Sequence, residues 1–326
     1  MSGSLLTYAI TAAALWVLGS AGIIIYSQQQ SIPAQVWMAV LPALLLELTM
    51  YIAPGFVAVR EKLAALGSKL APILIASAVA PYLLMSVPLG TFRLTWLLAL
   101  VVLAVVITYW YRVWTGGMAS DVLFLALVAA LFLSPFFKEV YVNPAGKPAL
   151  DIVGRLMWIR VCVLAILLVR GVEGVDYGFV PSGKDWKVGT LHFLMAACLI
   201  GPIAASIGFV HLRDVTWDLK MVLGAAGTFL GMLWVVALSE EFFFRGLLQQ
   251  ALLKSSGSVV VALAATSVVF GAAHLPMRGF PNWKFALCAT VAGVFYGLAF
   301  LRGKSIRSSM VTHALVNTAW RVFFTS

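Results

Sequence analysis

The sequence predicts an all-α fold, a polytopic membrane bundle of about eleven transmembrane helices. Of its 326 residues, 62% are hydrophobic and only 10% are charged, against roughly a quarter charged in soluble domains. The mean hydropathy of +1.01 applies to the whole chain, so the apolar character is not confined to one anchor. Apolar stretches of about twenty residues cross a bilayer core, where only helices satisfy the backbone polar groups over such a length.

Eleven apolar stretches are the predicted spans. They cover residues 5–26, 36–59, 70–90, 94–114, 119–137, 152–170, 188–209, 221–238, 258–274, 284–301 and 305–323. The span 152–170 is the weakest of these predictions because it contains Arg155 and Arg160. We expect the stretch 239–253 either to prolong the helix before it or to lie along the membrane surface. A polar interruption at 138–151, rich in turn-forming residues, predicts a boundary between regions 1–145 and 146–326.

The charge of the chain indicates contact with lipid rather than with nucleic acid. Lys and Arg number 22 against 12 Asp and Glu, a formal net charge of +10. These basic residues stand singly between apolar runs and form no patch of the kind that binds nucleic acid. Basic residues at the ends of membrane helices meet anionic headgroups and set orientation. We therefore expect a multi-pass integral membrane protein in a lipid bilayer, the plasma membrane of a bacterium.

Charged residues gather at one place in the C-terminal half, where Glu240, Glu241 and Arg245 follow an apolar run. Charge inside a membrane helix is costly and marks a functional candidate. Glu241 and Arg245 are four residues apart, so they share a helical face and can pair. Glu240 lies about 100° around the helix and is freer to face a cavity. The alternative is a structural ion pair beside a glutamate that reaches the membrane interface.

Two further pairs of residues lie on later predicted helices. Phe270 and His274 end a helix rich in small residues, and His313 and Asn317 share one face of the last span. Taken alone, His274 could be an interfacial residue at a helix end, where the helix dipole favours it. His313 and Asn317 could equally be a polar pair that joins helices.

Taken together, these three patterns resemble the motif set of the CAAX-protease and bacteriocin-processing family, which includes the type II CAAX prenyl endopeptidases. The order E-E-x-x-x-R, F-x-x-x-H, H-x-x-x-N is complete, and the resemblance covers roughly residues 180–326. It implies an intramembrane glutamate protease core in region 146–326, with region 1–145 as an accessory multi-pass part. It further implies four catalytic residues, with Glu241, Arg245 and Phe270 in support. The implied catalytic residues are Glu240, His274, His313 and Asn317.

The resemblance also implies the role of each residue. Glu240 is expected to be the general base, and His274 to hold and polarise the attacking water. His313 and Asn317 are expected to stabilise the oxyanion, and Arg245 to fix Glu241. We expect no cofactor and a metal-independent hydrolysis, because the chain has no H-E-x-x-H motif and adjacent glutamates diverge around a helix. Zinc remains an alternative, since two histidines and two glutamates are possible ligands.

The expected function is hydrolysis of a peptide bond in a membrane-associated peptide or protein. The best-known relatives cut prenylated CAAX tails, whereas in a bacterium without protein prenylation the expected substrate is a bacteriocin leader or a C-terminal sorting tail. The alternatives are a non-proteolytic membrane scaffold or immunity protein on the same fold, and a transporter with Glu47 and the Glu240 region as an ion or proton path. We interpret Glu47, in the middle of the second span, as a partner for a polar group of another helix or as a site near a helix break at Pro54.

Overall fold

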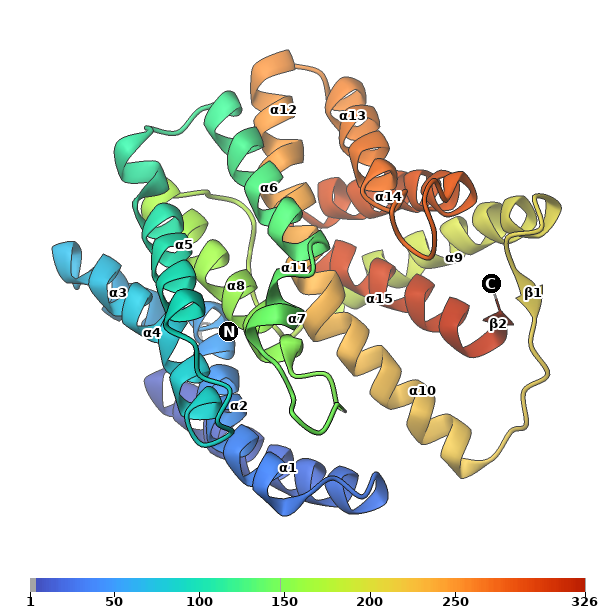
Figure 1. Ribbon diagram of the computed structural model, residues 1–326. Coiled ribbons are helices and arrows are strands. Elements are labelled where there is room, and N and C mark those ends of the chain that lie inside the picture. The colour runs from blue at the N-terminus through green and yellow to red at the C-terminus, as the bar shows by residue number, and fades with distance from the viewer. Residues whose placement is uncertain (1–3, 147, 326) are drawn as a thin grey trace. The chain divides into compact units, whose positions relative to one another are not determined.

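The computed structural model describes residues 4–146 and 148–325. Its regular structure is helical apart from one two-stranded ribbon, which confirms the predicted class of a polytopic membrane helical bundle. Packing divides the chain into two compact units, one ending at Gly171 and the other beginning at Val172. In Figure 1 the first unit runs from blue to green and the second from green to red. The functional boundary at 145/146 stays a prediction.

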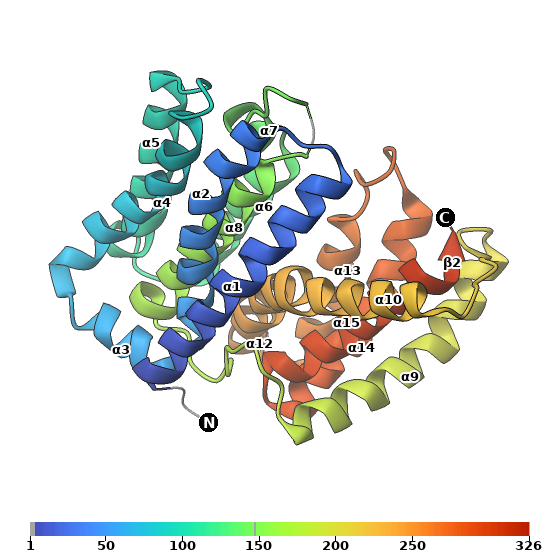
Figure 2. The same cartoon turned by 90° about the horizontal axis from the view of Figure 1, so that it is seen from below.

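The first unit contains eight helices among the residues that the structure describes, together with short 3₁₀ and π-helical turns. The helices are α1 (Leu5–Gln29), α2 (Ala34–Ile52), α3 (Val57–Ala64), α4 (Leu70–Ser86), α5 (Leu94–Val113), α6 (Met118–Leu133), α7 (Phe136–Val140) and α8 (Asp151–Leu164). The turns are η1 (Ala53–Gly55) and η2 (Gly67–Lys69), and η3 (Ala165–Arg170) prolongs α8. Helices α1 and α2 run side by side (Figure 2), and α2 also packs on α4 and α8.

Proline ends two of the predicted spans early. The predicted helix 36–59 stops at Ile52, where a 3₁₀ turn with Pro54 leads into α3. The predicted helix 119–137 stops at Leu133, and Pro135 then precedes the short helix α7. Both breaks follow from the missing proline N–H and from the clash of its ring with the preceding turn.

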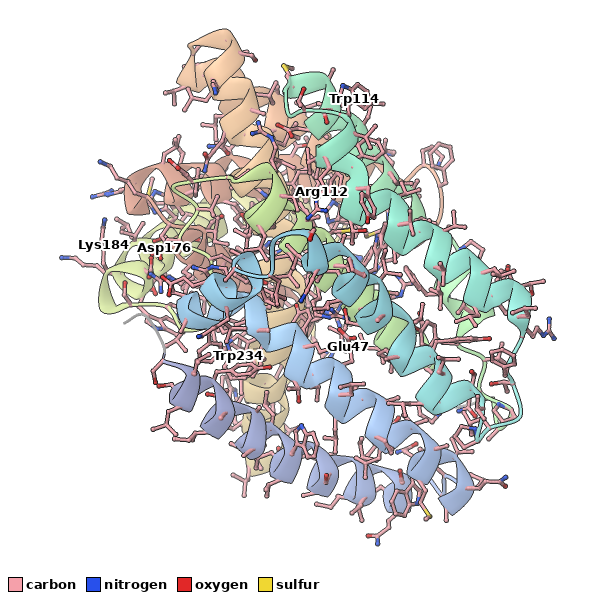
Figure 3. All side chains as sticks on the ribbon, turned by 90° about the vertical axis from the view of Figure 1, so that its left-hand side faces the viewer. Glu47, Arg112, Trp114, Asp176, Lys184 and Trp234 are labelled. Carbon is pink, nitrogen blue, oxygen red and sulfur yellow. The ribbon has the colours of Figure 1, made fainter. Side chains whose placement is uncertain are left out.

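Glu47 lies inside the first unit (Figure 3), where it is fully buried and paired with Arg160 of α8. Arg160 Nε donates to Glu47 Oε1 at 2.9 Å and Arg160 Nη2 donates to Oε2 at 3.1 Å. Ser77 of α4 accepts from the same guanidinium through its hydroxyl at 2.9 Å and its carbonyl at 3.1 Å. This pairing confirms that Glu47 is the partner of a polar group in another helix. It also explains how the span 152–170 tolerates a buried arginine.

The second unit contains seven helices and the ribbon among its described residues. These are α9 (Gly183–Ser206), β1 (His211–Leu212), α10 (Leu219–Gly231), η4 (Met232–Ala237), α11 (Leu238–Glu241), η5 (Phe242–Gln249), α12 (Gln250–Ser256), α13 (Val259–Ala272), α14 (Trp283–Gly303), α15 (Ile306–Phe323) and β2 (Phe324–Thr325). Helices α9, α14 and α15 pack on one another, and α13 packs along α14. The strands β1 and β2 pair antiparallel and join the end of α15 to the segment after α9.

Helices α10 to α12 form one continuous helix, Leu219–Ser256. Asp218 caps its first turn by accepting from the Met221 N–H, and Gly257 ends it with a left-handed conformation at φ 65°. The stretch 239–253 therefore prolongs the helix before it. Two π-helical segments, η4 and η5, flank the two glutamates, and such segments often occur at functional sites.

A glycine lets α9 and α15 approach closely next to the motif residues. A Cβ atom on Gly189 would lie 2.6 Å from Val311 Cβ and 2.8 Å from the Ser308 carbonyl oxygen. The Thr312 hydroxyl donates to the Gly189 carbonyl across the same contact at 3.0 Å. The backbone position of α15, which carries His313 and Asn317, is therefore set by direct contact with α9.

Eight helices in the part of the chain that the structure describes are long and apolar enough to cross a membrane. Three further predicted spans are helices that fall short of these criteria, so the count of eleven is not confirmed. Helices α6 and α13 are apolar but have only 16 and 14 residues. Helix α15 has 18 residues, and its sequence includes His313 and Asn317 among other polar side chains.

Candidate active site

The three sequence motifs converge in the second unit, although they lie on separate helices. Glu240 and Glu241 are in α11, at the middle of the long helix. His274 follows the C-terminal end of α13, and His313 and Asn317 are in α15. Helix α15 packs on η4, α11 and α14, which brings His313 to the two glutamates. The motif residues thus form one cluster of side chains.

Glu241 is the centre of this cluster and is fully buried. Its Oε1 accepts from Arg245 Nη1 at 3.2 Å and from His313 Nδ1 at 2.7 Å. Its Oε2 accepts from the hydroxyl of Ser309. The predicted pairing of Glu241 with Arg245 is therefore present, and two residues of α15 complete the set of donors.

Arg245 is held by groups from three elements. Its guanidinium is fully buried, and Nη2 donates to the carbonyl of Gly293 in α14 at 2.9 Å. The guanidinium carbon lies 4.7 Å from the ring centre of Phe270 and 5.3 Å from that of Tyr296. Contacts between a desolvated cation and aromatic faces are stabilising. Arg245 therefore joins η5 to α13 and α14 as well as neutralising Glu241.

Glu240, unlike the fully buried Glu241, is partly exposed and directs one carboxylate oxygen toward His313. Its side chain is 26% exposed, and its Oε2 lies 3.9 Å from His313 Nε2. That oxygen is buried and accepts no hydrogen bond from the described residues. The two nitrogens of His313 are thus directed to two different glutamates. Nδ1 is hydrogen-bonded to Glu241, and Nε2 is directed toward Glu240.

His274 is oriented by the backbone of its own helix. Its Nδ1 lies 2.8 Å from the Phe270 carbonyl oxygen, and because a carbonyl only accepts, Nδ1 carries the hydrogen. Nε2 of the neutral ring is then the nitrogen with a free lone pair. The ring of Phe270 packs near both histidines, with centroid distances of 4.8 Å to His274 and 5.7 Å to His313. Phe270 is therefore a packing partner that the two imidazoles share.

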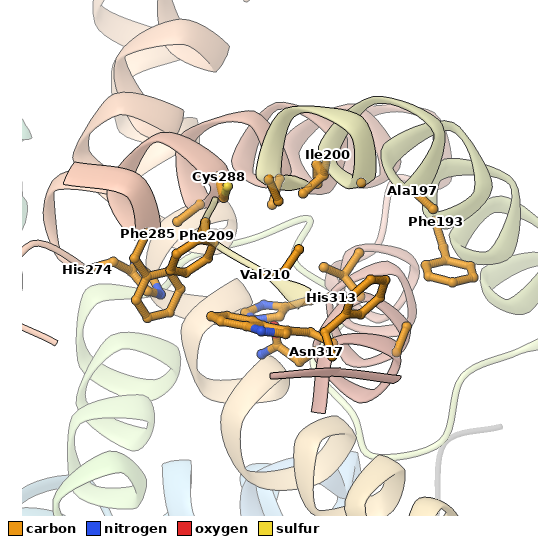
Figure 4. A pocket seen from close by; sticks show the side chains of 18 of the residues that line it. Phe193, Ala197, Ile200, Phe209, Val210, His274, Phe285, Cys288, His313 and Asn317 are labelled. Carbon is orange, nitrogen blue, oxygen red and sulfur yellow. The ribbon is translucent and has the colours of Figure 1, made fainter. Parts of the chain in front are cut away.

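A cavity of about 150 Å³ lies beside the cluster, between α9, α14 and α15. His274, His313 and Asn317 line it, as Figure 4 shows. Most of the other lining residues are apolar, including Ile200, Phe285 and further aliphatic and aromatic side chains. The cavity is therefore mainly apolar, with its polar groups gathered on one wall. Glu240 is not among the residues that line it.

Two residues of the cluster were not identified from the sequence. Ser309 precedes His313 by four residues and so shares its helical face, a spacing that could have drawn attention to it. Tyr296 of α14 stacks on the His313 ring with a centroid distance of 4.4 Å and an interplanar angle of 14°. Its position in the sequence gives no sign of this contact. Tyr296 therefore contacts the His313 ring directly, whereas Ser309 shares the Glu241 carboxylate with it.

The motif residues do not form a recognisable metal centre. Among residues 4–146 and 148–325, no group of three or more His, Cys, Asp or Glu side chains is arranged to hold a metal ion. Three ligands from the protein are usual at a catalytic zinc site. Both oxygens of Glu241 accept hydrogen bonds, from Arg245, His313 and Ser309.

The fold and the cluster together define a polytopic membrane protein with a buried glutamate–histidine site. Residues 222–319 match the family model described as type II CAAX prenyl endopeptidase Rce1-like. This segment contains all three motifs, and the match confirms the family resemblance seen in the sequence. The matched segment is therefore similar to the CAAX-type prenyl endopeptidases. No match was found among curated proteins or among solved structures.

Proposed function

We propose that this protein is an intramembrane endopeptidase in which Glu240 and the two histidines activate water for attack on a peptide bond. The observation that carries the proposal is the separation of 3.9 Å between Glu240 Oε2 and His313 Nε2. Two atoms at that distance are too far apart for a direct hydrogen bond, yet both can contact one water molecule. His274 lies on the wall of the neighbouring cavity, and in this proposal its Nε2 helps to hold the water while Glu240 takes the proton.

In this mechanism Glu240 takes a proton from water as its oxygen bonds to the carbonyl carbon of the substrate. The negative charge on the carbonyl oxygen is stabilised by the amide N–H of Asn317. The tetrahedral intermediate then breaks its C–N bond, and the proton on Glu240 passes to the leaving nitrogen. The carboxylate is regenerated, and the two products carry a new carboxyl and a new amino group.

The apolar walls of the cavity favour a substrate that is membrane-embedded or lipid-adjacent at the cleavage site. The matched family is named for prenylated CAAX substrates. Two fluorogenic peptides test the substrate class, one with an S-farnesyl cysteine before three aliphatic residues and one with an unmodified cysteine. Cleavage of only the first indicates that the lipid is recognised, and cleavage of both indicates that an apolar peptide is sufficient.

The test of the mechanism is Glu240→Gln in the full-length protein, reconstituted in lipid. This variant keeps the shape of the side chain and removes the base. General-base catalysis is worth about 10²–10⁴-fold, so cleavage should fall by about that factor while abundance in the membrane stays normal. A scaffold or immunity protein would retain its biological role with Gln at this position. Full complementation by Glu240→Gln would therefore defeat the proteolytic proposal.

A further inference from the structure

Ser309 contacts the centre of the cluster but belongs to none of the three motifs. It is fully buried, and its hydroxyl donates to Glu241 Oε2. It lies on α15 four residues before His313, on the same helical face. One helix thus supplies two donors to the same carboxylate, since His313 Nδ1 bonds to Oε1.

The Ser309 hydrogen bond fixes the orientation of the Glu241 carboxylate. Arg245 and His313 both donate to Oε1, so their bonds alone leave the other oxygen without a partner. Ser309 occupies that second oxygen and thereby opposes rotation of the carboxylate group. Because the site is buried, bulk water does not readily replace the Ser309 hydroxyl as a donor to Glu241. A hydrogen bond to a charged carboxylate is also stronger than one between neutral groups.

The orientation of Glu241 determines the orientation of His313. An ionised carboxylate only accepts hydrogen bonds, so the hydrogen of the 2.7 Å contact belongs to His313 Nδ1. With Nδ1 bound in this way, Nε2 is directed toward Glu240 Oε2. Tyr296 stacks on the flat face of the ring and limits tilting, but it leaves rotation within the ring plane to Glu241.

We propose that Ser309 is a positioning residue, which acts through Glu241 to hold His313 Nε2 toward Glu240 and the substrate. This inference rests on the proposed function. Ser309 itself does not touch the reacting atoms. Loss of the Ser309 hydroxyl removes none of the motif residues, but it leaves the orientation of the His313 ring less restricted. Such a change lowers the rate of the chemical step more than it lowers the binding of substrate.

The neighbouring residue Ser308 provides a matched control. It is also fully buried in α15, but its hydroxyl donates to Asp185 Oδ1 of α9 at 2.7 Å. Ser308→Ala and Ser309→Ala therefore remove the same group from adjacent positions of one helix. Each leaves a buried carboxylate with one donor fewer. Only the Ser309 hydroxyl bonds to Glu241.

The experiment measures kcat and KM for both serine variants with the better of the two fluorogenic peptides, using the full chain in proteoliposomes. Ser309→Ala should lower kcat about tenfold, with KM nearly unchanged, as expected for one weakened bond to a charged group. Ser308→Ala should keep the wild-type kcat. In a His313→Ala background, Ser309→Ala should cause no further loss, because its effect passes through that imidazole.

Three results would overturn this inference: wild-type kcat for Ser309→Ala, equal losses for both serine variants, or an undiminished loss in the His313→Ala background. If Ser309→Ala does not accumulate, Ser309→Cys keeps the volume with a weaker donor. That variant should show a several-fold loss of kcat, and wild-type kcat would again refute the inference. Failure of the proposed function is separate, because Glu240→Gln would then cleave the peptides as fast as the wild type.

Discussion

Arg245 provides a quantitative test of how the cluster is held together. Both Arg245 and Glu241 are fully buried, and the guanidinium also donates to the Gly293 carbonyl. Arg245→Ala leaves the Glu241 carboxylate buried without its cation and opens space between Phe270 and Tyr296. Removing one partner of a buried pair costs about 3–5 kcal/mol, a large share of the 5–15 kcal/mol that typically separates folded from unfolded domains.

The assay is accumulation in the membrane, followed by thermal unfolding of the purified protein in detergent. Arg245→Ala should lower both abundance and Tm, and activity should fall with the loss of the Glu241 orientation. Arg302→Ala serves as the control, because Arg302 is exposed near the end of α14 and its replacement should change the free energy of unfolding by less than about 0.5 kcal/mol. The double variant Glu241→Gln/Arg245→Met should recover part of the stability, though not the activity. An Arg245→Ala protein with normal abundance, Tm and activity would show that the pair is dispensable.

Three more predictions concern other parts of the molecule. Glu47→Gln should destabilise the first unit by about 3–5 kcal/mol in thermal unfolding, because Arg160 remains buried, and Glu47→Gln/Arg160→Met should restore part of that loss. Asn317→Ala should lower kcat by about 10²–10³-fold with normal abundance, since one oxyanion donor is lost; an unchanged kcat would remove Asn317 from the mechanism. Cleavage should persist in the presence of a zinc chelator. Stoichiometric zinc in the purified protein, with activity lost on chelation and restored by zinc, would instead establish a metalloprotease.

The sequence predicted the helical segments well because hydropathy and span length act locally. The predicted helix ends were less accurate near prolines and charged residues. Pro54 ended a predicted span early, while Glu240, Glu241 and Arg245 did not end theirs. The long helix continues through these charges because partners from other helices neutralise and bond them. Local hydropathy contains no information about those partners.

The site was predictable to the extent that its residues share a helical face. The pair Glu241–Arg245 followed from spacing alone and is present in the structure. Ser309 had the same kind of spacing relative to His313, but its acceptor is 68 positions away in the sequence. The stacking of Tyr296 on His313 depends on how α14 and α15 pack, so it required the tertiary structure.

The two glutamates that are fully buried among the described residues use arginine in different ways. Glu47 gives both of its oxygens to a single guanidinium, so that one ion pair joins two helices. Glu241 divides its oxygens among Arg245, His313 and Ser309, so part of its charge orients an imidazole. A carboxylate that only stabilised the fold would gain nothing from that division. This arrangement is expected where one residue, here Glu241, both stabilises the fold and orients a reactive side chain, here His313.

Glu240 completes this argument because its buried oxygen is left without a donor. Both oxygens of the neighbouring Glu241 accept hydrogen bonds, whereas Glu240 Oε2 accepts none from the described residues. Leaving a buried polar atom unpaired costs about 1–3 kcal/mol, so such atoms are uncommon where packing alone decides the structure. In the proposed reaction that oxygen is the one that receives the proton of the attacking water. The unpaired state of Glu240 Oε2 is thus destabilising for the fold, but it leaves the lone pair that the proposed proton transfer requires.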